Sequence, residues 1–290
     1  NMKTILKFCI LLFMISCSKG DISSQDESTG YNMLLIGNSF FKPYADHLNN
    51  LAFEANLIEH SSVIVKRGGE LGRPINFWND SNTEEHQLIK STLDQGNIEV
   101  FGMTSGYDID SENPTEGHSA WIQYALQKNP NIIIFIAIGS FDFPNGDSNS
   151  TRPDWDTFAS DNGFNSIQEF YDYYINEVIH KEIVDKLRDE FPSTKIFSIP
   201  TGWATKNLAQ MKIDNELLDD ISMFGPKSSS VFTDEKGHQG QIVIETGTMI
   251  WLSSIYNMDL SSFNYDTGFI TDLRAIAQDI IDSHDSNYKQ

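Results

Sequence analysis

The chain has 290 residues, of which 41 are Asp or Glu and 20 are Lys or Arg, so its formal net charge at pH 7 is −21. This charge argues against nucleic acid and anionic membrane surfaces as partners, because both repel a polyanion. With 39% hydrophobic and 12% aromatic residues, the chain has enough apolar material for one sizeable α/β core.

The first residues have the pattern of an export signal. Lys3 precedes an apolar stretch at 5–15, and Lys7 lies near the start of that stretch. The stretch is too short to cross a bilayer. The run Met14-Ile15-Ser16-Cys17 resembles a bacterial lipobox, whose cysteine is lipidated and begins the mature protein. The alternative is an ordinary cleaved signal in which Cys17 has no role.

Residues 18–30 are polar and predict a flexible tether. We therefore expect a signal peptide at 1–17, a tether at 18–30 and one folded domain at 31–290. The expected location is the outer membrane of a Gram-negative bacterium, facing the periplasm or the exterior, with the lipid on Cys17 as the sole membrane contact. Because the other cysteine, Cys9, lies in the signal, the folded domain has no disulfide and no thiolate metal site.

Ser39 follows the first apolar run of the domain. Residues 33–36 predict a buried strand that ends at Gly37-Asn38, and a helical pattern begins near Pro43. A serine on the turn between a first strand and a helix lies where α/β folds keep their chemistry, beside the N–H groups of a helix N-terminus. The alternative is that Ser39 only caps the helix.

Further along the chain, strand and helix patterns alternate. The expected strands span 33–36, 62–65, 98–103, 131–138 and 195–199, and the expected helices span 43–57, 118–128, 167–191, 203–224, 240–256 and 269–283. The run at 131–138 is the most continuously apolar and predicts a central strand. Alternation of this kind predicts an α/β three-layer sandwich with a parallel sheet of about five strands.

The polar stretch at 144–163 predicts a long loop that contains Trp155 and Phe158. Loops of this kind are either substrate-binding elements or insertions. His118 begins a predicted helix and is either a residue on the substrate side or a structural one. The sequence contains no His-x-His, His-Glu-x-x-His or calcium-loop spacing, so we expect no metal and no cofactor.

Two motifs resemble those of a known family. The chain lacks the Gly-x-Ser-x-Gly of α/β-hydrolases. Gly37-Asn38-Ser39-Phe40 and the later stretch Phe232–Tyr256, with Asp and His in a loop before an apolar helix, instead resemble the two end motifs of the SGNH (GDSL-like) hydrolases, as in exported bacterial members of that family. The resemblance spans about residues 31–256, and only its ends are specific. It implies a flavodoxin-like fold with Ser39 as nucleophile and His238 as base.

Two residues, Asp234 and Glu235, are candidates for the acid of this implied triad. In the family the acid lies three positions before the base, which would select Glu235, whereas Asp234 lies four positions before His238. Gly237 can absorb the extra residue through its conformational freedom, which favours Asp234. The alternative is that Asp234 and His238 merely form a polar loop capping the next helix.

The oxyanion-binding motifs match less well. Gly68-Gly69, after the second strand, matches the family's glycine block. The second block reads Gly139-Ser140-Phe141-Asp142, with Phe141 where the family has an asparagine. Loss of one donor typically costs about a hundred- to thousandfold in rate. A rebuilt hole would use the Ser39 and Gly69 N–H groups with Ser140 or Asn145, and Asn38 is a further candidate for substrate contact.

The resemblance therefore implies a serine hydrolase that cleaves an ester, and we expect this ester to be an O-acyl group on a carbohydrate. Its partner would be a small-molecule or glycan ester. The alternative, favoured by Phe141, is a surface lipoprotein that binds glycan on the same fold and has lost strong catalysis.

Overall fold

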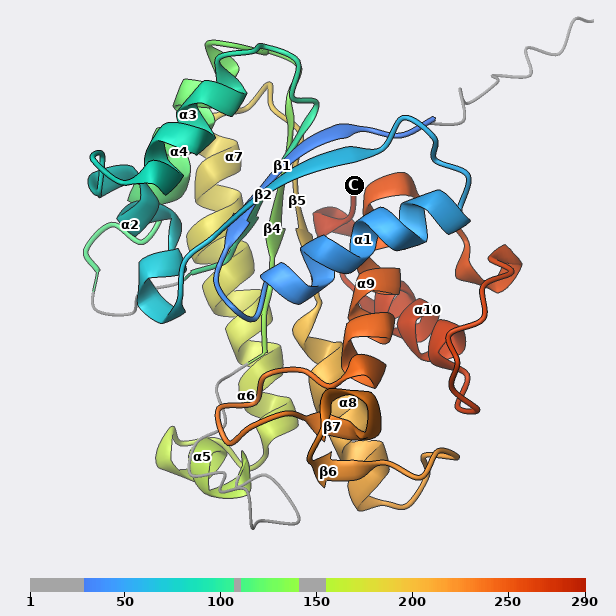
Figure 1. Ribbon diagram of the computed structural model, residues 1–290. Helices are drawn as coiled ribbons and strands as arrows, with labels where there is room; N and C mark the ends of the chain where they lie inside the picture. The colour runs from blue at the N-terminus through green and yellow to red at the C-terminus, as the bar shows by residue number, and fades with distance from the viewer. Residues whose placement is uncertain (1–28, 107–110, 141–154) are drawn as a thin grey trace, which may run out of the picture.

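The computed structural model describes residues 29–106, 111–140 and 155–290 (Figure 1). Five strands form one parallel sheet in the order β2-β1-β3-β4-β5. They are β1 (Asn32–Gly37), β2 (Ser61–Lys66), β3 (Val100–Thr104), β4 (Ile133–Ala137) and β5 (Ile196–Ile199). This is the flavodoxin-like strand order, so the predicted fold class is confirmed. The strand predicted as central, β4, lies inside the sheet beside the middle strand β3.

Both faces of the sheet are buried, which explains the continuous apolar runs of its inner strands. Leu34 and Ile36 of β1 belong to one hydrophobic cluster, and Met33 and Leu35 belong to the other. Successive side chains of a strand point to opposite faces, so each strand contributes to both clusters.

Helices cover each face and complete the three layers (Figure 1). One face packs against α1 (Lys42–Glu54), α8 (Gly202–Ile213), α9 (Gln241–Tyr256) and α10 (Leu273–Ser283). The other face packs against α2 (Pro74–Asn79), α3 (Glu84–Leu93), α4 (Glu116–Leu126) and one continuous helix. That helix consists of α6 (Ile167–Tyr173), a π-helical stretch η2 (Tyr174–Asp185) and α7 (Lys186–Glu190).

Short elements connect these layers. Two three-residue strands, β6 (Ser222–Phe224) and β7 (Ser230–Phe232), pair in parallel as a separate two-stranded sheet. The others are the 3₁₀ turns η1 (Gly69–Gly72), η3 (Lys227–Ser229), η4 (Leu260–Ser262) and η5 (Ser286–Tyr288), and the helix α5 (Trp155–Asp161). Of the helices in the described part of the chain, none is both long and apolar enough to cross a membrane.

The prediction of helix across 203–224 is partly wrong. Helix α8 ends at Ile213, and Asn215 has a φ of +57°, a left-handed conformation that stops the helix. The segment after it is held open by Asp219, whose carboxylate accepts hydrogen bonds from the backbone N–H groups of Ile270 and Thr271. The backbone N–H of Leu218, in the same segment, donates to the Thr271 side-chain oxygen at 3.0 Å and not to a helical carbonyl oxygen.

The prediction of a loop across 144–163 is also partly wrong. Trp155 and Phe158 lie on α5. Trp155 is only 6% exposed and packs edge-on against Phe232. It is therefore a core residue, and the aromatic side chain contributes to folding. Residues 144–154 of that loop lie outside the described residues, as do the predicted signal at 1–17 and residues 18–28 of the tether.

Candidate active site

Ser39 lies on the turn between β1 and α1, as predicted. The Asn38 side-chain oxygen accepts hydrogen bonds from the backbone N–H groups of Phe40 at 3.0 Å and Phe41 at 3.2 Å. An Asx turn of this kind fixes the backbone around the serine without using its hydroxyl. The N-cap of α1 is Phe41, and it has no side-chain capping bond. The alternative that Ser39 merely caps the helix is therefore wrong.

The Ser39 hydroxyl is directed at the imidazole of His238. The distance from Ser39 Oγ to His238 Nε2 is 2.8 Å, and that from His238 Nδ1 to Asp234 Oδ2 is 2.6 Å. These contacts fit the tautomer that carries its proton on Nδ1, which leaves Nε2 free to accept the serine proton. The expected proximity of Ser39 and His238 is met, and Asp234 is the carboxylate that reaches the imidazole.

The extra residue in the late loop is accommodated by Gly237, whose φ is +91°. In this conformation the backbone N–H groups of Lys236 and His238 both donate to Asp234 Oδ1, each at 3.1 Å. Partial burial acts to raise the pKa of Asp234, but these bonds and the bond from the imidazole outweigh it and lower the pKa. The carboxylate thus stays ionised beside the imidazole.

The alternative that this loop only caps the next helix does not hold. The N-cap of α9 is Gly240, and no side chain caps it. The Asp234 carboxylate bonds within its own loop and to the imidazole, as given above.

Two residues that the sequence motifs left without a role hold the imidazole in place. The ring of Phe40 stacks on that of His238, with centroids 4.7 Å apart and planes 11° from parallel. The Gln239 side-chain amide donates to the Phe40 carbonyl oxygen at 2.8 Å. These contacts tie the two loops together across about two hundred residues of sequence. The only sequence signal for them was their position next to Ser39 and His238.

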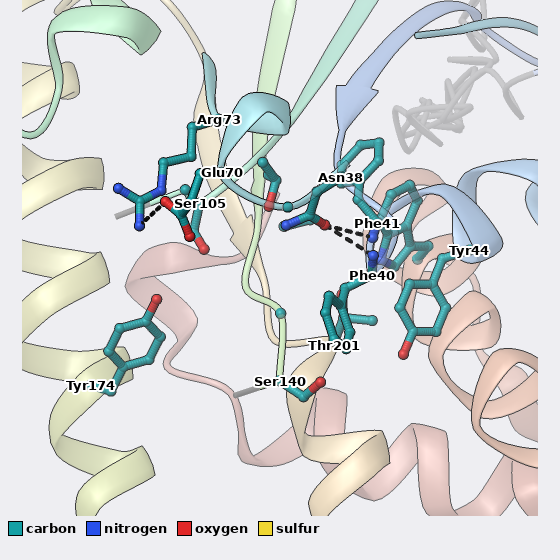
Figure 2. Close-up of a pocket in the computed structure, with 16 residues that line it drawn as sticks. Asn38, Phe40, Phe41, Tyr44, Glu70, Arg73, Ser105, Ser140, Tyr174 and Thr201 are labelled. Carbon is teal, nitrogen blue, oxygen red and sulfur yellow. Dashed lines mark hydrogen bonds and ion pairs between the residues drawn. The ribbon is translucent and has the colours of Figure 1, made fainter. Parts of the chain in front are cut away.

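A polar cavity of about 140 Å³ opens beside the serine, at the carboxyl ends of the strands (Figure 2). Each of the five strands leads into it, through Asn38, Gly69, Ser105, Ser140 and Thr201. Ligands of open parallel sheets bind at this edge. Figure 2 shows Asn38 and Ser140 on opposite sides of the cavity. Ser39 itself lines an adjoining open depression.

The predicted oxyanion residues are partly brought together. Gly69, with a φ of +52°, lines the cavity, whereas Gly68 is exposed and does not. The turn η1 packs closely against the serine turn, because a Cβ on Gly72 would lie 2.7 Å from Asn38 Cα. Within the described part of the chain, the backbone N–H groups of Ser39 and Gly69 donate to no acceptor.

Ser140 lines the same cavity. Its hydroxyl oxygen is buried and has no hydrogen-bond partner among the described residues. A buried hydroxyl without a partner is costly unless a ligand satisfies it. Phe141, which stands where the family has an asparagine, and Asn145, the alternative to Ser140 in the predicted rebuilt hole, lie outside the described residues.

His118 has a structural position. It is 2% exposed, and its Nε2 lies 3.0 Å from the carbonyl oxygen of Thr104 at the end of β3. Burial lowers its pKa to about 4, so the ring is neutral at physiological pH. No group of three or more His, Cys, Asp or Glu residues in the described ranges is placed to hold a metal ion.

Two solved structures are similar to this chain. One is the periplasmic domain of a lipopolysaccharide acetyltransferase from Salmonella ser. Paratyphi A, at 15% identity and a TM-score of 0.44, covering 79% of this chain and 83% of that one. The other is a GDSL-like lipase from Parabacteroides merdae ATCC 43184, at 14% identity and a TM-score of 0.41, covering 77% and 94%. No family model matches, and a search of curated proteins finds no match. Likenesses of this degree carry no inference about activity.

Proposed function

We propose that the protein is a serine hydrolase of the SGNH type that cleaves an ester, with an O-acylated carbohydrate as its substrate. The observation that carries this proposal is the continuous hydrogen-bonded series from Ser39 through His238 to Asp234. A nucleophile, a base within hydrogen-bond reach and a carboxylate that orients the base are the features that define this class of mechanism.

In the proposed reaction, Ser39 Oγ attacks the ester carbonyl while its proton passes to His238 Nε2. The C–O bond to the alcohol then breaks, and His238 returns the proton to the leaving oxygen. Water, deprotonated by the same imidazole, attacks the acyl-serine; the bond from the acyl carbon to Ser39 Oγ breaks, His238 returns the proton to Ser39 Oγ, and the carboxylic acid leaves. The ionised Asp234 stabilises the imidazolium that forms in both halves of the reaction.

The negative charge on the carbonyl oxygen needs hydrogen-bond donors. The backbone N–H groups of Ser39 and Gly69 are assigned this role, together with the hydroxyl of Ser140. Support comes from their free hydrogen-bonding capacity and from the cavity that Gly69 and Ser140 share. Preorganised donors of this kind supply a large part of the rate in acyl transfer.

A carbohydrate ester is favoured over a lipid by the chemistry of the cavity. Its walls carry the polar side chains of Asn38, Thr104 and Ser105 and the ion pair of Glu70 with Arg73. An extended acyl chain would have to bury apolar surface against these groups, which gives little hydrophobic stabilisation. The cavity suits a short acyl group on a hydrophilic alcohol. Trp155, on the segment predicted as a substrate-binding loop or an insertion, gives no support because it is buried.

The alternative, a glycan-binding lipoprotein without catalysis, rested on Phe141, which lies outside the described residues. The complete Ser39–His238–Asp234 arrangement supports the hydrolase. Turnover of p-nitrophenyl acetate and acetylated xylan by the parent and by Ser39→Ala tests the choice. We expect turnover by the parent alone. Equal, near-zero turnover in both, with xylan binding retained, would support the binding protein and overturn the hydrolase.

We further propose that the domain is exported and anchored at the outer membrane through lipidated Cys17. The support is the basic and apolar pattern of residues 1–17 followed by a polar tether. Fractionation of a Cys17→Ala variant tests this. We expect release into the soluble fraction. If the variant stayed with the membrane at high salt, the anchor would lie elsewhere in the chain.

A further inference from the structure

Ser39 is flanked by two concavities of different character. The residues before and after it, Asn38 and Phe40, line the recessed polar cavity, which has a volume of about 140 Å³. Ser39 itself lines an open depression of about 470 Å³. An acylated sugar likewise consists of two parts of different size, a small acyl group and a larger alcohol. The recessed cavity fits the acyl group, and the open depression fits the alcohol, which must extend toward solvent and leave first.

The open depression gathers positive charge in a strongly acidic protein. Its charged lining consists of Lys42, Lys66, Lys227 and Asp46, with His47 beside them. Lys42 forms an ion pair with Asp46 on the next turn of α1. Lys66 and Lys227 are exposed, and neither makes an ion pair with any described residue. Two ammonium groups without an acidic partner in the described ranges therefore face this depression, in a chain whose net charge is −21.

The fold holds the two free lysines near the nucleophile. Lys66 is the last residue of β2 and pairs in register with Gly37, two residues before Ser39. Lys227 lies on η3, the turn that joins β6 to β7, and this turn packs against α9. The lysines come from segments about 160 residues apart and meet only in the folded chain. Their exposure leaves the ammonium groups available to a ligand.

Glu245, the buried acid that contacts His47 of the lining, does not offset the charge of the two lysines. Glu245 of α9 is 4% exposed. It accepts hydrogen bonds from the Gln241 amide at 2.7 Å and the Tyr265 hydroxyl at 3.1 Å, and contacts His47 Nε2 at 2.8 Å. Because three partners bind its carboxylate, Glu245 presents no acceptor to a ligand. Its contact with His47 holds that side chain in the lining of the depression.

We propose that the depression lined by Lys66 and Lys227 binds the alcohol part of the substrate, and that this alcohol carries an anionic group, a carboxylate or a phosphate, near the esterified hydroxyl. The inference rests on the proposed hydrolase function and narrows its substrate class. An anionic sugar has no favourable long-range attraction to this protein as a whole. The two lysines supply a local attraction at the one place where it would position an ester against Ser39.

Three acetyl esters that differ in charge test the proposal: acetylated methyl glucoside, methyl glucuronide and glucose 6-phosphate. We expect the parent to prefer an anionic ester in kcat/KM and to lose that preference as salt rises. In Lys66→Gln/Lys227→Gln, the preference for anionic over neutral ester should fall by about two- to twentyfold, the effect of removing two exposed ion pairs. The glucuronide and phosphate arms distinguish the two anions.

The matched control is Lys195→Gln/Lys212→Gln, which removes the same charge from positions outside the depression. It should leave the preference unchanged. A preference that is absent in the parent, or that falls equally in both double variants, would overturn the proposal.

Binding measurements separate this proposal from the hydrolase proposal. Calorimetry on Ser39→Ala with an acidic oligosaccharide, oligogalacturonate, should show binding that Lys66→Gln/Lys227→Gln weakens. If the parent hydrolysed no ester but this lysine-dependent binding held, the hydrolase proposal would fail and the anion site would stand. Absence of both binding and anionic preference would reject the site alone, provided that the parent cleaves the neutral ester.

Discussion

At the residue scale, the site depends on a few side chains that each do a separate task. Asn38 shapes the turn, so the Ser39 hydroxyl stays free for His238. Phe40 covers one face of the imidazole, and Asp234 binds its far nitrogen. Because Asp234 also accepts two backbone N–H bonds, its orientation is fixed before any substrate binds. Preorganisation of this kind avoids reorganisation during the reaction.

Asp234→Asn should reduce kcat for p-nitrophenyl acetate by about a hundred- to ten-thousandfold, because an amide can stabilise the wrong tautomer and cannot stabilise imidazolium. Circular dichroism should show an intact fold, since Asn can still accept the backbone bonds of the loop. Glu235→Gln is the matched control and should change kcat by less than about threefold. The reverse ranking of the two variants would identify Glu235 as the acid.

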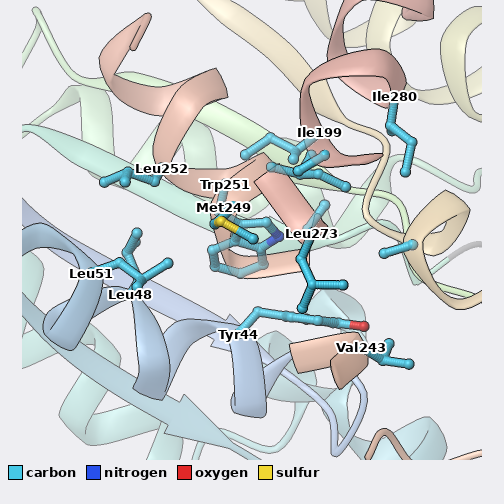
Figure 3. Close-up of a cluster of buried hydrophobic side chains, with 14 of the residues drawn as sticks. Tyr44, Leu48, Leu51, Ile199, Val243, Met249, Trp251, Leu252, Leu273 and Ile280 are labelled. Carbon is cyan, nitrogen blue, oxygen red and sulfur yellow. The ribbon is translucent and has the colours of Figure 1, made fainter. Parts of the chain in front are cut away.

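At the element scale, α9 is the helix that supports the site from beneath. It is buried along nearly its whole length and packs against α1, α8 and α10. Figure 3 shows Tyr44 of α1 lying against side chains of α9, among them Val243 and Trp251. The Trp251 indole N–H donates to Thr201 Oγ at 2.7 Å, which joins α9 to the end of β5. Some residues that line the cavity, such as Tyr44 and Trp251, therefore also belong to the hydrophobic core.

Gly247→Ala tests this packing. A Cβ at position 247 would lie 2.3 Å from the Tyr44 ring, which is buried and cannot move aside. The overpacking cost of about 1–3 kcal/mol is set against a gain in helix propensity of about 1 kcal/mol, so we expect a net loss of up to about 2 kcal/mol in unfolding free energy. Ser254→Ala in the same helix is the control, expected within about 0.5 kcal/mol of the parent. Urea denaturation measures both, and a stabilised Gly247→Ala would contradict the packing.

At the scale of the whole molecule, buried neutral histidines make stability depend on pH. The pKa of His118 is lowered by burial to about 4, and burial also lowers the pKa of His284 to about 4 and that of His180 to about 3. The unfolded chain binds protons near pH 6.5, whereas the folded chain does not. The folded state therefore keeps its full stability above that pH and loses it as the pH falls toward 4.

His118→Gln isolates one of these contributions. The parent should lose about 1 kcal/mol of unfolding free energy per pH unit for each such histidine between pH 6 and 5. Glutamine can still donate to the Thr104 carbonyl oxygen but does not titrate. The variant should therefore be less stable at pH 7 yet show a pH slope smaller by about 1 kcal/mol per unit. Equal slopes in both proteins would mean that His118 titrates alike in the folded and unfolded states.

The elements of the sheet were predictable because their signal is local. A strand buried on both faces must be apolar throughout, and the runs at 33–36 and 131–138 satisfy this rule without reference to the rest of the chain. The segment after Ile213 was not predictable, because Asp219 holds it open through bonds to Ile270 and Thr271, about fifty residues away. The position of Trp155 in the core was not predictable for the same reason, because Trp155 packs against the distant residue Phe232.

For the site, the sequence alone determined the two motifs that carry Ser39 and His238 and the parallel α/β fold, because strand periodicity and motif spacing are written in neighbouring residues. Only the tertiary structure decided that Asp234 reaches the imidazole, that Phe40 stacks on it, and that Lys66 and Lys227 line one depression. These are contacts between the carboxyl ends of strands and distant loops. Parallel strands bring those ends to one edge, and side-chain geometry there depends on backbone conformations, such as that of Gly237, which no residue pattern fixes by itself.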